Sequence, residues 1–110
     1  MSEKRKDEPQ RGVALKTRDE RKTTRPRMYR VLLHNDDYTA QDFVVWVLES
    51  IFNKPHGEAF AIMLNVHRSG LGLAGVYTHD VAETKLKATR QAAEEHEFPL
   101  LVTMEPEENR

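Results

Sequence analysis

An amide, two carboxylates and an imidazole carry the chemistry that this 110-residue sequence could support. Asn35, Asp36 and Asp37 are consecutive, and His67 ends an otherwise apolar helical stripe, one turn after Met63. Neutral imidazole, carboxylate and amide groups accept hydrogen bonds, and an ammonium group offers three N–H donors. Placed beside apolar side chains, this set could hold a cation attached to a hydrophobic group. Each feature alone also has an ordinary interpretation, as a polar turn after a strand and as a histidine at the edge of a core.

Covalent catalysis at these residues is disfavoured. Ser50 and Ser69 lie in no nucleophile-elbow motif, and the chain contains no cysteine that could act as a thiol nucleophile. A His–Asp pair could act in acid–base catalysis, but a short domain with one shallow site is poorly suited to excluding water. We therefore expect a binding protein and not an enzyme.

Two further patterns resemble ligand sites but lack the required context. The segment 70–75 matches the dinucleotide pattern GxGxxG, yet the expected helix precedes it and the strand follows it, which is the reverse of the order that pyrophosphate binding needs. We interpret its glycines as a helix stop and a flexible loop. His56 and His67 share a helix face but lie about 16 Å apart, so they cannot hold one zinc ion. We expect neither a metal nor a cofactor.

The elements that position these groups follow from hydrophobic periodicity. Residues 28–34 are rich in β-forming types and lead into the polar turn, so they are predicted to form a strand. Thr39, three residues before Asp42, predicts a capped start for a first helix, although the valines in its apolar stripe would also suit a strand. That helix is expected to end before Pro55.

The second half of the sequence continues the pattern of strands and helices. The pattern predicts a helix over 56–68, a short strand over 75–78, a third helix opened by Asp80 with Glu83, and a last strand over 100–104. The order is β-α-α-β-α-β, which indicates an α+β domain with its helices on one face of a small sheet.

Charge divides the chain into two parts. Residues 1–27 contain ten Lys and Arg against five Asp and Glu, whereas residues 28–110 contain seven against thirteen. The first part has too few apolar residues to offset the entropy of ordering its backbone. We therefore expect a flexible basic N-terminal extension over 1–27 and one folded domain over 28–110.

The basic extension raises the question of nucleic acid. Five acidic residues interrupt it, it has no aromatic residue, and an acidic domain follows, so phosphate binding is the weaker interpretation. The longest apolar run, 43–48, is far shorter than the ~20 residues of a membrane span. No apolar block follows the basic start, so we expect a cytoplasmic protein that contacts no membrane.

Four collinear blocks of the sequence resemble the ClpS family. They are residues 28–39, 63–67, 75–78 with 81–85, and 99–101, and the resemblance covers residues 28 to about 105. ClpS proteins are adaptors of the bacterial AAA+ protease ClpAP and deliver substrates of the N-end rule. The resemblance implies a three-stranded antiparallel sheet with three helices packed on one face, similar to the C-terminal domain of the ribosomal stalk protein.

The resemblance also implies a site for N-degrons. Asn35, Asp36 and His67 would hold the free α-amino group of the substrate. An adjoining hydrophobic pocket would receive an N-terminal Phe, Tyr, Trp or Leu side chain. The matching pocket positions are Leu33, Asp37, Thr39, Gln41, Val44, Met63, Val66 and Leu100.

Two residues beside the expected pocket depart from the family. His34 stands where the family often has an apolar residue, and Gln41 stands where it has a gating methionine. A glutamine at the rim could relax a steric gate, bind a tyrosine hydroxyl or narrow the mouth. We therefore predict a narrower or reordered preference for the first residue, with binding retained.

Partner binding is also implied by the resemblance. The stretch containing Asp80, Glu83, Thr84 and Lys85 resembles the surface that docks the N-terminal domain of the ClpA-type unfoldase, and its ordinary interpretation is a solvated helix start. The extension at 1–27 fits a role in delivery. We expect a non-enzymatic adaptor without a cofactor. The alternative is a basic-armed nucleic-acid-associated or ribosome-associated protein.

Overall fold

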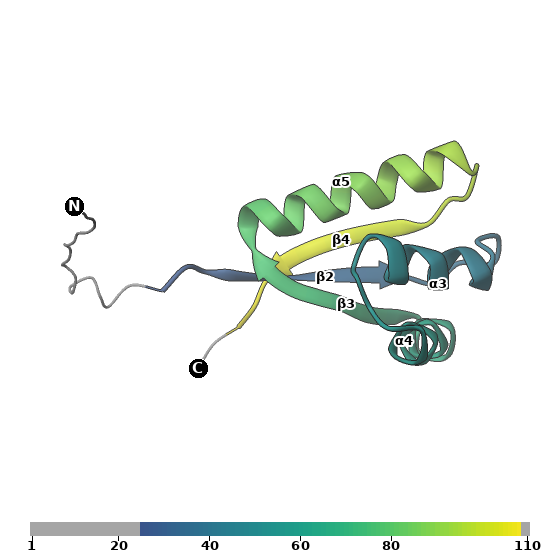
Figure 1. The fold of residues 1–110 in the computed structure, drawn as a ribbon, viewed down its shortest axis with the longest axis horizontal. Helices are drawn as coiled ribbons and strands as arrows, with labels where there is room; N and C mark the ends of the chain where they lie inside the picture. Colours follow the sequence, from purple (N-terminus) through teal and green to yellow (C-terminus); the bar gives the residue numbers. More distant parts are fainter. Residues whose placement is uncertain (1–24, 109–110) are drawn as a thin grey trace, which may run out of the picture.

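The computed structural model describes residues 25–108. Most of the flexible extension predicted over 1–27 lies outside this range, and the predicted strands and helices all form in the predicted order. They are β2 (Met28–His34), α3 (Gln41–Ser50), α4 (His56–Ser69), β3 (Leu71–Thr78), α5 (His79–Glu95) and β4 (Leu101–Pro106), as Figure 1 shows.

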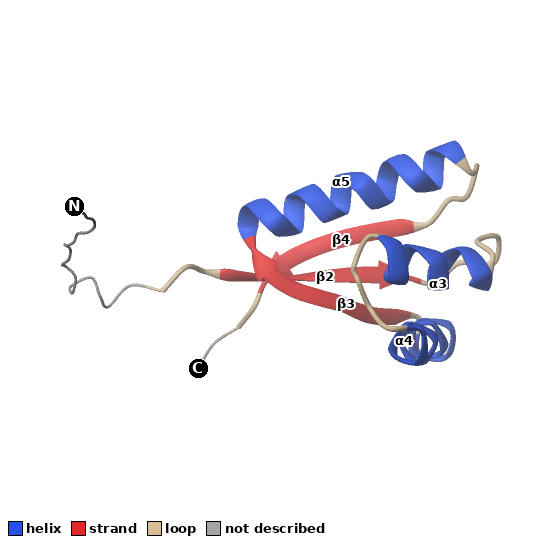
Figure 2. Ribbon diagram, in the orientation of Figure 1, coloured by secondary structure: helices blue, strands red, loops and turns tan. Residues whose placement is uncertain are grey.

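The three strands form one antiparallel sheet in the order β3-β2-β4, with β2 in the centre (Figure 2). Because side chains alternate along a strand, Val31 and Leu33 of β2 point to one face and Leu32 to the other. Val31 and Leu33 belong to the core, which the three helices cover. The predicted α+β fold, with its helices on one face of the sheet, is confirmed.

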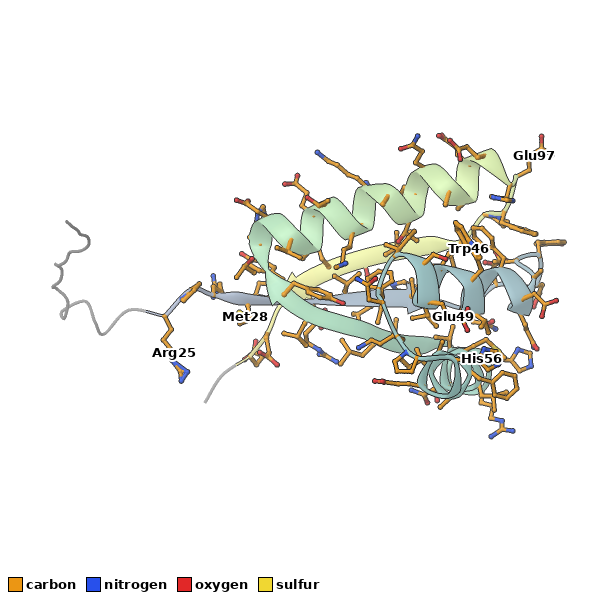
Figure 3. All side chains as sticks on the ribbon, in the orientation of Figure 1. Arg25, Met28, Trp46, Glu49, His56 and Glu97 are labelled. Atoms are coloured by element: carbon orange, nitrogen blue, oxygen red, sulfur yellow. The ribbon has the colours of Figure 1, made fainter. Side chains whose placement is uncertain are left out.

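The core lies between this sheet face and the helices. α4 and α5 contact the strands directly, and α3 packs on α4 while inserting Phe43, Val47 and Leu48 into the same cluster. Full burial of one such side chain stabilises the fold by about 1.5–3 kcal/mol. Figure 3 shows Glu49 of α3 beside His56 at the start of α4, and the Glu49 Oε2 and His56 Nδ1 atoms lie 2.5 Å apart. This contact ties the beginning of α4 to α3.

The flexible loop predicted for the glycine-rich segment 70–75 is wrong, since β3 already begins at Leu71. Gly70 does end α4 as predicted, in the left-handed conformation with φ of 87°. Gly72, by contrast, lies inside the strand, where β3 passes so close to α4 that an added Cβ would collide with the Val66 side chain. The glycine is needed there for close packing, which local patterns do not distinguish from flexibility.

The cap predicted at Thr39 is also wrong. Ala40 is the N-cap residue of α3, and the Thr39 hydroxyl donates instead to the Asp36 carboxylate. α5 begins at His79 after Thr78, one residue before the Asp80 that the sequence pattern gave as its opening residue. Neither N-cap residue makes a side-chain capping hydrogen bond. In the first case the polar turn competes for the hydroxyl that a cap would use.

Candidate functional site

A cavity of about 200 Å³ lies at the end of the sheet, where β2 gives way to the polar turn. It is smaller than the ~300–1,000 Å³ typical of pockets for drug-sized ligands, so its size suits a small group such as one side chain. Contributions come from the β2–α3 connection, from α3 and α4, and from the residue before β4. The lining residues are His34, Asn35, Asp36, Asp37, Thr39, Gln41, Val44, Met63, Val66, His67 and Leu100.

The structure brings together every residue predicted for this site except Leu33. Leu33 is fully buried and belongs to the core, because strand alternation points its side chain at the helices. His34, the next residue along, lines the cavity instead. Leu33 belongs to the same core cluster as Val44, Met63 and Val66 of the lining, so its role in the pocket stays a prediction.

Asp36 organises the turn at the mouth of the cavity. Its Oδ1 atom accepts hydrogen bonds from the amides of Tyr38 and Thr39, each at 2.7 Å, and its Oδ2 atom accepts one from the Thr39 hydroxyl at 2.7 Å. Partial burial acts to raise the pKa of Asp36, but the three hydrogen bonds together outweigh it and hold the pKa below 3.8. The carboxylate therefore stays charged at neutral pH. A carboxylate offers about four lone-pair sites, which leaves room for a further donor.

A backbone hydrogen bond ties the residue after β2 to the end of α4, the helix that carries His67. The backbone N–H of Asn35 donates a 3.0 Å hydrogen bond to the carbonyl of Gly70. Gly70 ends α4 and lies three positions after His67. Both Asn35 and His67 are exposed to solvent. The end of β2 and the last turn of α4 thus place an amide and an imidazole at one mouth.

The floor of the cavity is apolar. Met63 and Val66 lie one turn apart on α4 and are both 3% exposed, while Val44 comes from α3 and Leu100 is the residue before β4. The residues lining this cavity include no serine, cysteine or lysine that could serve as a nucleophile. The arrangement combines hydrogen-bond acceptors at the mouth with hydrophobic surface beneath them. It can bind a group that carries both an ammonium and an apolar side chain.

The second predicted surface, at the start of α5, is not assembled as a single set. The side chains of Asp80 and Glu83 are exposed, and the Thr84 hydroxyl donates to the Asp80 carbonyl. Lys85 turns inward: its Nζ atom donates a 2.7 Å hydrogen bond to the carbonyl of Ile51. Its ammonium also lies 5.3 Å from the centre of the Tyr77 ring. Lys85 therefore joins α5 to the end of α3, and burial raises the pKa of Tyr77 beside it.

Within residues 25–108, one group of side chains has ligand atoms close enough together for a metal ion. His79, Asp80 and Glu83 place these atoms within 4.8 Å of one another. They stand on the surface at the N-terminal turn of α5, where the helix dipole disfavours a cation. The geometry gives no independent reason to assign a metal there.

No helix in the part of the chain that the structure describes is long and apolar enough to cross a membrane.

A small α+β domain whose cavity has hydrogen-bond acceptors at its mouth and an apolar floor has the geometry of a binding site for a small group. Comparison with known proteins gives the particular class, since residues 24–103 match the family model described as "ATP-dependent Clp protease adaptor protein ClpS". The chain belongs to the ClpS family. It is therefore an adaptor of the Clp protease and not an enzyme.

Individual relatives agree with this assignment. The chain is 57% identical over 91 residues to the ATP-dependent Clp protease adapter protein ClpS of Desulfatibacillum aliphaticivorans, which covers 83% of this chain and 88% of the relative. It is 48% identical over 103 residues to the ClpS adapter protein of Myxococcus xanthus, and the match covers 94% of this chain and 96% of the relative. Among solved structures, Agrobacterium tumefaciens ClpS2 bound to L-phenylalaninamide has a TM-score of 0.73 and 41% identity, over 76% of this chain and all of the other.

Proposed function

We propose that this protein is a cytoplasmic N-degron adaptor. It binds substrates through their free α-amino group and a bulky hydrophobic first side chain, and it delivers them to a ClpA-type AAA+ unfoldase for degradation by ClpAP. The observation that carries the proposal is one cavity in which Asn35, Asp36 and His67 surround the mouth while Met63 and Val66 form the floor.

Binding divides between the two ends of the substrate's first residue. The ammonium donates to the charged carboxylate of Asp36 and to the acceptors of Asn35 and His67. The side chain enters the apolar part of the cavity, where burial contributes about 2 kcal/mol at ~25 cal/mol per Å². The solved ClpS2 structure supports this division, since L-phenylalaninamide is a free amine attached to an aromatic side chain.

Discrimination arises from the hydrogen-bonding groups at the mouth. An acetylated or internal residue lacks the ammonium and would leave these groups unpaired, at a cost of ~1–3 kcal/mol for each one that becomes buried. The adaptor therefore selects a free N-terminus because any other ligand leaves the hydrogen-bonding groups at the mouth without partners. No bond in the substrate is broken by the adaptor itself.

Delivery requires a second surface that contacts the N-terminal domain of the unfoldase. We place it at the first turns of α5, where Asp80 and Glu83 expose their carboxylates. Lys85 supports this surface from behind through its bond to Ile51. Residues 1–27 would form the basic extension that engages the unfoldase during delivery.

Degradation of a reporter protein tests the proposal as a whole. ClpA and ClpP are incubated with a reporter whose mature N-terminus is Phe, and with the same reporter preceded by Met. We expect this protein to accelerate loss of the Phe reporter alone, and the Glu83→Ala variant to bind the Phe reporter normally but accelerate its loss less. Equal loss of both reporters, with or without the adaptor, would contradict the proposal.

A further inference from the structure

The face of the sheet that no helix covers carries four leucines. On this outer face His34 stands between Leu71 of β3 and Leu101 of β4, its direct partners in the two ladders. In the next row Leu32 stands opposite Leu73. The solvent-facing side of an antiparallel sheet is ordinarily polar, so leucines at these positions call for an explanation.

Two of these leucines expose much of their surface at the end of the sheet near the cavity. Leu71 is 41% exposed and Leu101 is 51% exposed; in the next row Leu73 is 39% exposed, whereas Leu32 between the flanking strands is only 5% exposed. Between Leu71 and Leu101, the His34 ring lies 2.8 Å from Thr103, measured from Nε2 to Oγ1. This contact fixes the imidazole over the sheet. The result is an apolar surface on either side of an anchored ring.

This surface is continuous with the mouth of the cavity. His34 itself lines the cavity, and the next residue, Asn35, donates to the carbonyl of Gly70, which directly precedes Leu71. Residues directly opposite each other in a sheet have Cβ atoms about 4.5–5.5 Å apart, while an extended peptide advances about 3.3 Å per residue. A chain whose amine lies at Asn35 therefore reaches Leu71 or Leu101 with its next two residues.

We infer that His34, Leu71 and Leu101 form a subsite for the second and third residues of a substrate, and that this subsite favours apolar side chains there. The inference rests on the proposed function, because it takes the position of the substrate's amine from it. Its occupant is the extended segment directly after the N-terminal residue. The substrate class is thereby narrowed to chains with a bulky hydrophobic first residue followed by apolar residues.

Peptide binding measured by fluorescence anisotropy tests the subsite. Two labelled peptides begin Phe-Leu-Leu and Phe-Ser-Ser and are otherwise identical. The full chain is expected to bind the Phe-Leu-Leu peptide roughly fivefold more tightly, as partial burial of a leucine would give. In the double variant Leu71→Ser with Leu101→Ser, we expect the two affinities to agree within about twofold while that for Phe-Ser-Ser is unchanged.

Val81→Ser provides the matched control. Val81 is 43% exposed but lies on α5, outside this surface, so its replacement should leave the preference intact. Equal affinities in the unmodified chain, or a preference that survives the double substitution, would overturn the subsite. Failure of the proposed function would give a different result: the Phe-Ser-Ser peptide would not bind at all, or would bind equally well after N-acetylation. Either result would also overturn the subsite.

Discussion

The Thr39 hydroxyl donates a 2.7 Å hydrogen bond to Asp36 Oδ2, so the carboxylate that faces the cavity also holds the turn leading into α3. The amides of Tyr38 and Thr39 donate to the other oxygen. One side chain thus has a structural task and, in the proposed function, a binding task. Substitutions at this residue must be tested for both.

Replacement of Asp36 by alanine should weaken binding of a Phe-initiated peptide about 10- to 100-fold, because a hydrogen bond to a charged group is worth about 1.5–3 kcal/mol. Anisotropy measures the affinity, and circular dichroism checks that the domain stays folded. Asp37→Ala is the matched control, since Asp37 also lines the cavity and carries the same charge, and we expect a smaller effect from it. Equal effects of the two variants would show that general charge, and not Asp36, attracts the amine.

The stability that Asp36 provides should depend on pH. A carboxyl whose pKa is lower in the folded chain than in the unfolded chain contributes fully above the unfolded value, near 3.8, and loses that contribution as the pH falls through the folded value. The difference in free energy of unfolding between the original chain and Asp36→Asn should be constant above about pH 5. It should shrink below pH 3.8. Urea unfolding across this range measures it, and a difference that grows on acidification would have the wrong sign.

Gly72→Ala should disturb both the fold and the cavity. The new Cβ would collide with Val66, which lines the cavity, and overpacking of this kind typically costs about 1–3 kcal/mol. Both the unfolding midpoint and peptide affinity should fall. Gly57→Ala is the control, because a Cβ there meets no atom within 4 Å, and it should leave binding unchanged. A Gly72→Ala variant as stable as the original would mean that β3 and α4 separate without cost.

Lys85→Ala should lower the free energy of unfolding by roughly 1–2 kcal/mol, since it removes a hydrogen bond to Ile51 and a cation lying over the Tyr77 ring. Lys87→Ala is the control: Lys87 is exposed and, among the described residues 25–108, pairs with Glu83, four residues earlier, at 3.5 Å. Chemical denaturation compares the two. If the Lys85 variant were as stable as the original chain, Lys85 would have no structural role, and only its proposed role in partner binding would stand.

The site was more predictable than the details of the backbone around it. The polar turn and the helix histidine could be predicted from local patterns, and the resemblance to ClpS predicted that they belong to the same site. Strand alternation points Leu33 inward, into the core cluster that also holds Val44, Met63 and Val66 of the cavity lining, so its place in the pocket stays a prediction. Alternation is a local rule that a sequence does reveal.

Other features depend on contacts between distant segments and could not be predicted locally. Gly72 has the composition of a loop but packs against Val66 from another element. In the sequence, Lys85 is an ordinary charged residue on a helix, and its hydrogen bond to the Ile51 carbonyl at the end of α3 depends on the tertiary structure. Thr39 fits a helix cap by spacing, yet the Asp36 carboxylate takes its hydroxyl.

The central claim is that the cavity recognises a free α-amino group together with the first side chain. The most direct test measures binding of one Phe-initiated peptide before and after N-acetylation, under the same conditions and with the same label. We predict that acetylation, which removes the ammonium that Asp36 would bind, abolishes measurable binding. Equal affinity for the two peptides would contradict the account.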